Sequence, residues 1–128
     1  MTQIKVNAII KNNGKILVAK RCSRDGGFWQ TITGTVENNE NIIDTLKREI
    51  KEEAGISKIK IDKTPVHYFI WQKGKDDVVE IVYLVSTKEA NVKLSQEHDA
   101  YLWLEPKAAI KKVGKANNKM AIRKAMMI

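Results

Sequence analysis

The chain has 128 residues, of which 43% are hydrophobic, a proportion too high for a disordered protein and enough for one folded domain over residues 1–128. Its formal net charge is +8, which suits a polyanionic partner or, alternatively, a lysine-rich surface that keeps the chain soluble, and no apolar run approaches the roughly 20 residues that cross a bilayer. Cys22 is the single cysteine, so a disulfide within the chain is excluded. The first residues also lack a signal-peptide layout, and we therefore expect a cytoplasmic protein with no membrane partner.

The amino-terminal third of the chain predicts strands. Residues 4–10 and 15–22 are rich in β-branched and aliphatic side chains, and the sequence Asn12-Asn13-Gly14 between them is typical of a tight turn. These residues predict an antiparallel hairpin. A loop with two glycines follows at 23–27, and residues 28–33 alternate as a short strand.

A helix is predicted next, over residues 42–54. Asn41 is a suitable N-cap with Asp44 three positions later, and Gly55 is suited to end the helix in a left-handed turn. Its apolar residues recur at spacings of three and four, which predicts one buried stripe formed by Ile43, Leu46, Ile50 and Ala54.

Three glutamates share a second face of this helix. Glu49, Glu52 and Glu53 are related by spacings of three and four, so their carboxylates converge beside the apolar stripe, at the rim of the core. Like charges on one face repel, and Arg48 neutralises only part of them. A solvated acidic face is one interpretation; the other is a site for a hard divalent cation such as Mg²⁺.

The remainder of the chain predicts a mixed α/β domain. Strands are expected at 59–61, 66–71, 78–86 and 101–104, with a polar turn at 73–77, and helices at 108–113 and 117–127. Six of the fifteen acidic residues lie between Glu37 and Glu53, so the rest of the chain is more basic. A basic frame around an acidic site suits a polyanionic substrate held through bridging cations.

The stretch from Gly34 to Ile56 resembles the Nudix signature without a departure. That signature is a glycine, five residues, a glutamate, seven residues, Arg-Glu, an apolar residue, any residue, Glu-Glu, any residue, a glycine and an apolar residue. In this chain the places are occupied by Gly34, Glu40, Arg48, Glu49, Ile50, Glu52, Glu53, Gly55 and Ile56. The resemblance implies an α/β/α sandwich with a mixed sheet, a loop–helix–loop motif, and hydrolysis of phosphoanhydride bonds.

The resemblance also implies roles for individual residues. Glu49, Glu52 and Glu53 become the metal ligands, for Mg²⁺ or alternatively Mn²⁺, joined by a backbone carbonyl of Thr33 or Gly34. Arg48 is expected to orient a glutamate, and Glu40 to support the loop or contact the metal. Because a further carboxylate often comes from another loop, Glu97 is our candidate for a fourth ligand or the base, with Asp99 and Glu80 as rivals. His98 is either a proton relay or a structural residue.

Substrate-binding candidates lie just before the signature. Arg21, with Arg24 and Lys20 behind it, is expected to hold phosphates, and Phe28 and Trp29 are candidates for stacking on a base, although either residue also suits the core.

The chain also resembles a narrower group, the bacterial dihydroneopterin triphosphate pyrophosphohydrolases, some of which act on dATP. The stretches that carry this resemblance are FWQTITGTVE, EHDAYLWL and NNKMAI. It implies a small nucleoside or pterin triphosphate as substrate. Two alternatives stay open: a hydrolase of dinucleoside polyphosphates or RNA 5′ ends, and a nucleotide- or RNA-binding module without turnover. The intact glutamate set argues against the last.

Overall fold

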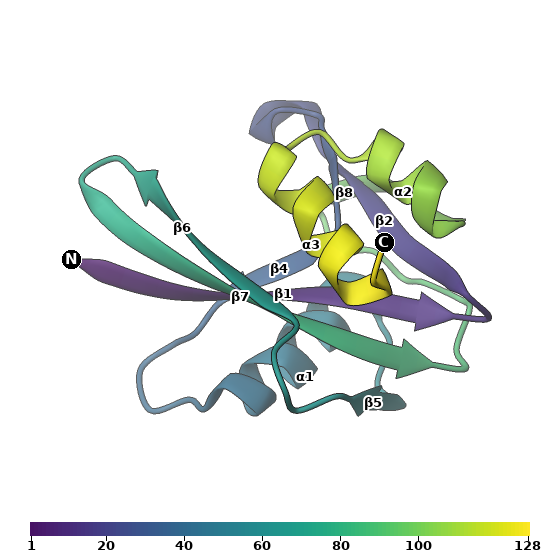
Figure 1. The fold of residues 1–128 in the computed structure, drawn as a ribbon, viewed down its shortest axis with the longest axis horizontal. Helices are drawn as coiled ribbons and strands as arrows, with labels where there is room; N and C mark the ends of the chain where they lie inside the picture. Colours follow the sequence, from purple (N-terminus) through teal and green to yellow (C-terminus); the bar gives the residue numbers. More distant parts are fainter.

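A computed structural model describes all residues from 1 to 128 (Figure 1). Eight strands, three α-helices and one short 3₁₀ turn make up the chain. In order they are β1 (Thr2–Asn12), β2 (Lys15–Arg21), η1 (Ser23–Asp25), β3 (Trp29–Gln30), β4 (Ile32–Thr35), α1 (Ile42–Ala54), β5 (Ile59–Ile61), β6 (His67–Lys73), β7 (Asp76–Thr87), β8 (His98–Leu104), α2 (Pro106–Lys112) and α3 (Ala116–Met126).

The sheet is mixed, as predicted. Its centre is a long parallel pair, β1 beside β7, in which Lys5 lies opposite Glu80 and Asn7 opposite Val82. All other pairings are antiparallel: β2 and β4 join β1, β3 and β8 join β2, and β5 and β6 join β7. The predicted hairpin at Asn13 and Gly14 is confirmed, since both residues have positive φ angles, 49° and 77°, as a two-residue hairpin turn requires.

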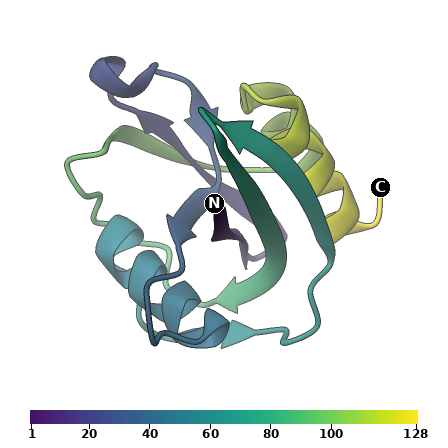
Figure 2. The same cartoon turned by 90° about the vertical axis from the view of Figure 1, so that its left-hand side faces the viewer.

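Alternating side chains of β1 pack into two separate hydrophobic cores, one on each face of the sheet. Val6 and Ala8 point to one face and pack with Leu46 and Ile50 of α1, whereas Ile9 points to the other face and packs under α2 and α3. Figures 1 and 2 show α1 on one side of the strands and α2 with α3 on the other. The predicted α/β/α sandwich is confirmed.

The prediction of one continuous strand at 28–33 is wrong. Two short strands replace it, β3 paired with β2 and β4 paired with β1, and the chain crosses between them at Thr31. The Thr31 amide donates to Asn118 Oδ1 at 3.0 Å, and its hydroxyl donates to Asn7 Oδ1 at 2.6 Å. These buried bonds to side chains replace the ladder at this residue. The break depends on a partner 87 residues away in the sequence, which local alternation does not reveal.

Helix α1 begins and ends where the sequence predicts. Asn41 Oδ1 accepts the Asp44 amide at 2.8 Å, and Asn41 Nδ2 donates to the Asp44 carboxylate at 2.9 Å. Gly55 ends the helix with a φ of 69°. Of the predicted stripe, Leu46, Ile50 and Ala54 are completely buried and Ile43 is half-buried.

None of the helices has the length and apolar character needed to cross a membrane.

Candidate active site

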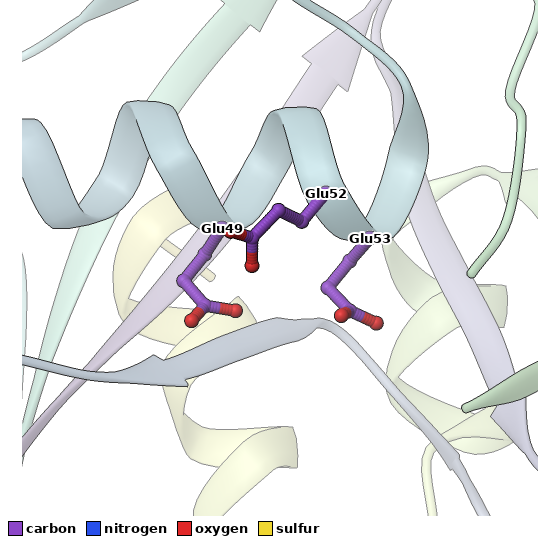
Figure 3. Close-up of side chains that lie close together, drawn as sticks. All are labelled: Glu49, Glu52 and Glu53. Carbon is purple, nitrogen blue, oxygen red and sulfur yellow. The ribbon is translucent and has the colours of Figure 1, made fainter. Parts of the chain in front are cut away.

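The three glutamates predicted as metal ligands converge at the carboxyl-terminal half of α1. One carboxylate oxygen from each of Glu49, Glu52 and Glu53 lies within 4.8 Å of the others, and Figure 3 shows the side chains leaving the same side of the helix. Glu53 is buried, Glu49 half-buried and Glu52 exposed, so the cluster lies at the rim of the core. The predicted juxtaposition of the three carboxylates is therefore present.

Gly34 permits Glu49 to reach this position. A methyl group added at Gly34 would overlap the Glu49 carboxylate, because that side chain lies directly across the β4 backbone. The glycine of the signature is thus required by close approach of a side chain and not by an unusual backbone angle. That the Gly34 carbonyl is a metal ligand stays a prediction.

Arg48 holds the acidic loop and the helix together. Its guanidinium makes a bidentate pair with Glu40, Nε to Oε2 at 2.7 Å and Nη2 to Oε1 at 3.0 Å. Its Nη1 also donates to Glu49 Oε1 at 2.8 Å and to Glu52 Oε2 at 3.3 Å. Arg48 therefore contacts two of the three glutamates, and its role in orienting them for catalysis stays a prediction.

Glu40 closes the loop before α1. Besides Arg48, its carboxylate accepts the Thr45 hydroxyl at 2.7 Å and the Glu37 amide at 3.2 Å. These donors, Arg48 foremost, lower the pKa of Glu40 to about 2. With its oxygens taken by these donors, Glu40 fits the supporting role better than direct metal contact.

Glu53 is fixed from the strand side. Ser95 donates its hydroxyl to Glu53 Oε2 at 2.7 Å, and His98 Nδ1 lies 3.3 Å from the same oxygen, without hydrogen-bond alignment and with no other partner. On the far side of the ring, Gln30 Nε2 lies 3.2 Å from His98 Nε2. An amide nitrogen only donates, so this contact keeps the imidazole proton on Nδ1, facing Glu53. His98 lowers the pKa of Glu53 while burial opposes it.

Glu97 lies in the same turn as Ser95 and His98. Its side chain is exposed, and its amide donates to Ser95 Oγ at 3.2 Å. It is not one of the three carboxylates that cluster within 4.8 Å. The loop predicted to approach the helix does so, and a role for Glu97 as ligand or base stays a prediction. Of its rivals, Asp99 is exposed on β8 and Glu80 is buried in a pocket on the other face of the sheet.

That pocket, of about 520 Å³, lies beside the amino-terminal end of α3. Its lining is basic, aromatic and polar, with contributions from β1, β2, β3, β4, β6, β7 and α3; the residues are Lys5, Asn7, Arg21, Phe28, Gln30, Thr33, Phe69, Trp71, Gln72, Glu80, Lys115, Asn117 and Asn118. A larger hollow of about 650 Å³ at the start of α1 contains none of the three clustered glutamates and no arginine. The basic and aromatic pocket is therefore the better place for a phosphorylated heterocycle.

The predicted substrate-binding residues divide between the pocket and the core. Arg21 lines the pocket and pairs with Asp25 at 3.4 Å, and Phe28 lines it with the Lys115 ammonium 4.8 Å from its ring centroid. Trp29 does not line the pocket: it packs against the core under α2 and α3, with Lys112 over its ring at 4.9 Å. Phe28 directly precedes β3 and Trp29 is its first residue, and only Phe28 reaches the pocket.

Several pocket residues escaped the sequence-based prediction. Phe69 and Trp71 supply aromatic faces from β6, and Lys5 and Asn7 are polar residues that alternate with the apolar Ile4, Val6 and Ala8 in β1. Two polar side chains on the same face of a central strand were the available signal, because a buried position rarely carries them without a purpose.

Lys5 electrostatically links the pocket to the glutamates. Burial lowers the pKa of its ammonium, and the charges of Glu80 in the pocket and Glu49 on α1 act in the opposite direction. A cation that interacts with carboxylates of both sites is available to a phosphate chain.

The donor set at α1 fits a divalent metal ion. Three hard carboxylate oxygens lie close together, Arg48 pairs with only two of these glutamates, and burial raises the pKa of Glu49. A carboxylate cluster of this kind is stabilised when a cation binds it.

An acidic helix rim and a basic, aromatic pocket on an α/β/α sandwich suit a hydrolase of phosphoanhydride bonds. The NUDIX domain family model matches residues 1–124. The chain belongs to the Nudix family, which generally uses divalent metal ions, and the predicted family and enzyme class are confirmed.

Three similar proteins show the range of the resemblance. The chain is 28% identical over 110 residues to the nucleoside triphosphatase NudI of Escherichia coli, covering 77% of this chain and 78% of that protein. It is 30% identical over 112 residues to an octanoyltransferase of Myxococcus xanthus, covering 83% of this chain and 31% of that larger protein. The solved dihydroneopterin triphosphate pyrophosphohydrolase of E. coli superposes with a TM-score of 0.81 at 24% identity, covering 97% of this chain and 94% of the other.

Proposed function

We propose that this chain is a Mg²⁺-dependent pyrophosphohydrolase that cleaves a small nucleoside or pterin triphosphate to a monophosphate and pyrophosphate, with Mn²⁺ as an alternative ion. The observation that carries the proposal is the presence in one domain of two sites with complementary chemistry: the carboxylates of Glu49, Glu52 and Glu53, and a pocket with cationic and aromatic walls. The names of the NudI relative and of the E. coli structural neighbour support the same substrate class.

The roles of the residues follow from their positions. A divalent ion at the three glutamates supplies charge neutralisation and an activated water. Arg48 keeps Glu49 and Glu52 in place, while Ser95 and His98 hold Glu53 from the opposite side. Lys5 and Arg21 are available for the phosphate chain, and Phe28, Phe69 and Trp71 for the heterocycle. Glu97, from the neighbouring turn, is proposed as the base that accepts a proton from the attacking water.

The position of cleavage follows from charge. In the proposed reaction a water oxygen bonds to the innermost phosphorus, and the bond from that phosphorus to the bridging oxygen of pyrophosphate breaks. Pyrophosphate leaves readily only when its developing negative charge is neutralised, and a cluster of carboxylates that holds cations provides this. The heterocycle in the pocket sets the distance from the base to the glutamates, which brings the inner phosphorus next to them.

Product analysis in ¹⁸O-labelled water tests the reaction. A panel of nucleoside triphosphates and dihydroneopterin triphosphate, assayed with Mg²⁺ or Mn²⁺, should release pyrophosphate and a monophosphate. The labelled oxygen marks the phosphorus that was attacked. Orthophosphate carrying the label, together with a diphosphate product, would contradict the proposed cleavage. Turnover of a dinucleoside polyphosphate or an RNA 5′ end, with none of the small triphosphates, would replace the proposed substrate class.

A further inference from the structure

Glu80 is a buried carboxylate with no cation within ion-pair distance. It lies on the central strand β7 with 7% of its surface exposed and lines the pocket described above. None of the ion pairs in the structure includes it. An ionised carboxylate in such a place is unfavourable unless hydrogen bonds satisfy its oxygens, so its presence within the apolar central stretch of β7, residues 78–85, needs a reason.

The hydrogen bonds of Glu80 leave half of its accepting capacity free. Oε1 accepts the indole N–H of Trp71 at 3.1 Å, and Oε2 accepts the amide of Asn7 at 2.9 Å. A carboxylate has about four acceptor positions, two on each oxygen. Each oxygen therefore retains one acceptor position, and no other side chain of the protein occupies it.

The buried hydrogen bonds around Glu80 fix the orientation of Asn7. Asn118 donates to the Thr31 hydroxyl at 2.8 Å, and that hydroxyl donates to Asn7 Oδ1 at 2.6 Å. Asn7 is thereby fixed with its oxygen towards Thr31 and its nitrogen towards Glu80. The chain of donors runs from α3 through β1 to the carboxylate, so Glu80 is the acceptor at which the network ends.

We propose that the Glu80 carboxylate selects the heterocycle of the substrate by accepting two adjacent N–H groups, from a ring nitrogen and the neighbouring exocyclic amine. This edge belongs to a 2-amino-4-oxo-pyrimidine ring, which guanine and pterins share. Adenine and cytosine present an amine beside an acceptor nitrogen, and uracil presents a single N–H between two carbonyls. Phe28, Phe69 and Trp71 line the same pocket and supply ring faces for stacking. The inference rests on the proposed function and makes it narrower, because it places guanine or pterin triphosphates ahead of dATP.

The first experiment changes the substrate and leaves the protein intact. The wild-type chain should cleave dGTP or dihydroneopterin triphosphate with a kcat/KM at least about 10-fold above that for dATP, because a site built to bind N–H groups rejects analogues that lack them. The inosine analogue dITP, which keeps the ring N–H and lacks the amine, should fall roughly 10-fold below dGTP. The guanine and pterin arms also show which of the two rings the pocket prefers.

The second experiment repeats the comparison of substrates with the Glu80→Gln variant. The variant replaces one acceptor by a donor, so the ratio of kcat/KM for dGTP over dITP should fall close to one, with dATP affected least. Glu105→Gln, an exposed glutamate at the start of α2 and outside the pocket, removes the same charge and should keep the wild-type ratio. Equilibrium binding of dGMP against dAMP, without metal, should show the same preference and the same loss.

The outcomes separate the inference from the function on which it rests. If no triphosphate is cleaved, the proposed function fails. If triphosphates are cleaved with equal efficiency for dGTP, dITP and dATP, or if Glu80→Gln lowers all of them by one factor, the function stands and Glu80 has a purely structural role. Should Glu80→Gln fail to fold, the dGTP and dITP comparison on the wild-type protein still decides whether two donors are recognised.

Discussion

Gly34 sets the position of Glu49, and Glu53 is the most constrained of the three glutamates. Both effects act at the scale of single residues, because a change of one methyl group or one oxygen is enough to disturb them. Glu49 lies directly over a backbone without a side chain, and Glu53 is contacted by Ser95 and His98 from another part of the sheet. Each residue therefore makes a separate prediction.

Replacing Gly34 by alanine should displace Glu49 without unfolding the chain. The added methyl group overlaps the Glu49 carboxylate, and that side chain has to move away from Glu52 and Glu53. A misplacement of about 1 Å costs roughly 10²-fold in rate, so we expect a loss of that size in kcat. Gly74→Ala is the control: its methyl group meets nothing within 4 Å, and its positive φ costs about 1 kcal/mol in stability only. Equal activity in both variants would show that Glu49 tolerates displacement.

Glu53→Gln should keep the fold and lower turnover by at least about 10²-fold at saturating Mg²⁺, since charge stabilisation through a metal ion contributes several kcal/mol. The amide is close in size to the carboxylate and still accepts the Ser95 hydroxyl, which lies 2.7 Å from Oε2. Circular dichroism and steady-state kinetics on the same preparation check the two parts. Near-wild-type turnover in a folded variant would remove Glu53 from the mechanism.

At the scale of elements, the sequence predicted best where the cause is local. Asn41, Asp44 and Gly55 define the ends of α1 through contacts a few residues apart, and the structure has these ends. The strand before the signature was predicted as continuous, because its interruption at Thr31 comes from Asn7 and Asn118, which no local pattern reveals.

The site likewise has one part that depends on local sequence and one part that depends on contacts distant in sequence. The three glutamates converge through helical spacing alone, which a single segment encodes. The pocket is assembled from many strands and one helix, and membership depends on which face of each strand a residue occupies. Phe28 lines it, whereas its neighbour Trp29 packs in the core.

The cap of α1 should contribute to stability and not to chemistry. Asn41→Ala removes the acceptor of the Asp44 amide and should lower the free energy of unfolding by about 1 kcal/mol, with kcat unchanged where the chain is folded. Urea denaturation measures the first effect. Asn91→Ala, another exposed asparagine outside the helix, should leave stability within about 0.5 kcal/mol of wild type. A comparable loss in both variants would mean that the cap bond is not the cause.

The turn that carries Ser95 and Glu97 should affect catalysis from outside the helix. Glu97→Gln should reduce kcat more than it raises KM, because the proposed proton transfer occurs only in the transition state. Asp99→Asn, an exposed change on the neighbouring strand β8, is the matched control. If Asp99→Asn is the damaging variant and Glu97→Gln is silent, the choice of residue in this segment is wrong.

At the scale of the whole molecule, the sheet separates the carboxylates of α1 from the Glu80 carboxylate. The glutamates of α1 lie on one face, and Glu80 lies in the pocket on the face covered by α3. Arg48 lowers the pKa of Glu40 to about 2, and His98 lowers that of Glu53, whereas burial raises the pKa of Glu80. The stability of the protein therefore contains terms that depend on pH in opposite directions.

The contribution of Glu80 to the stability of the folded chain should decrease as pH rises. Its folded-state pKa lies above the ordinary value of 4.5, so the folded chain favours the protonated carboxyl. The stability linked to this group is fully present below the unfolded-state pKa and is lost as pH rises through the raised folded pKa. Glu80→Gln has no such titration, and the free energy of unfolding of the variant minus that of wild type should therefore increase from pH 4 to pH 8. Urea denaturation at each pH measures the difference, which cancels the opposing contributions of Glu40 and Glu53. For Glu105→Gln the difference in the free energy of unfolding from wild type should not change with pH. If the difference for Glu80→Gln also stays constant or falls, the buried carboxylate is as well stabilised in its charged form as in water.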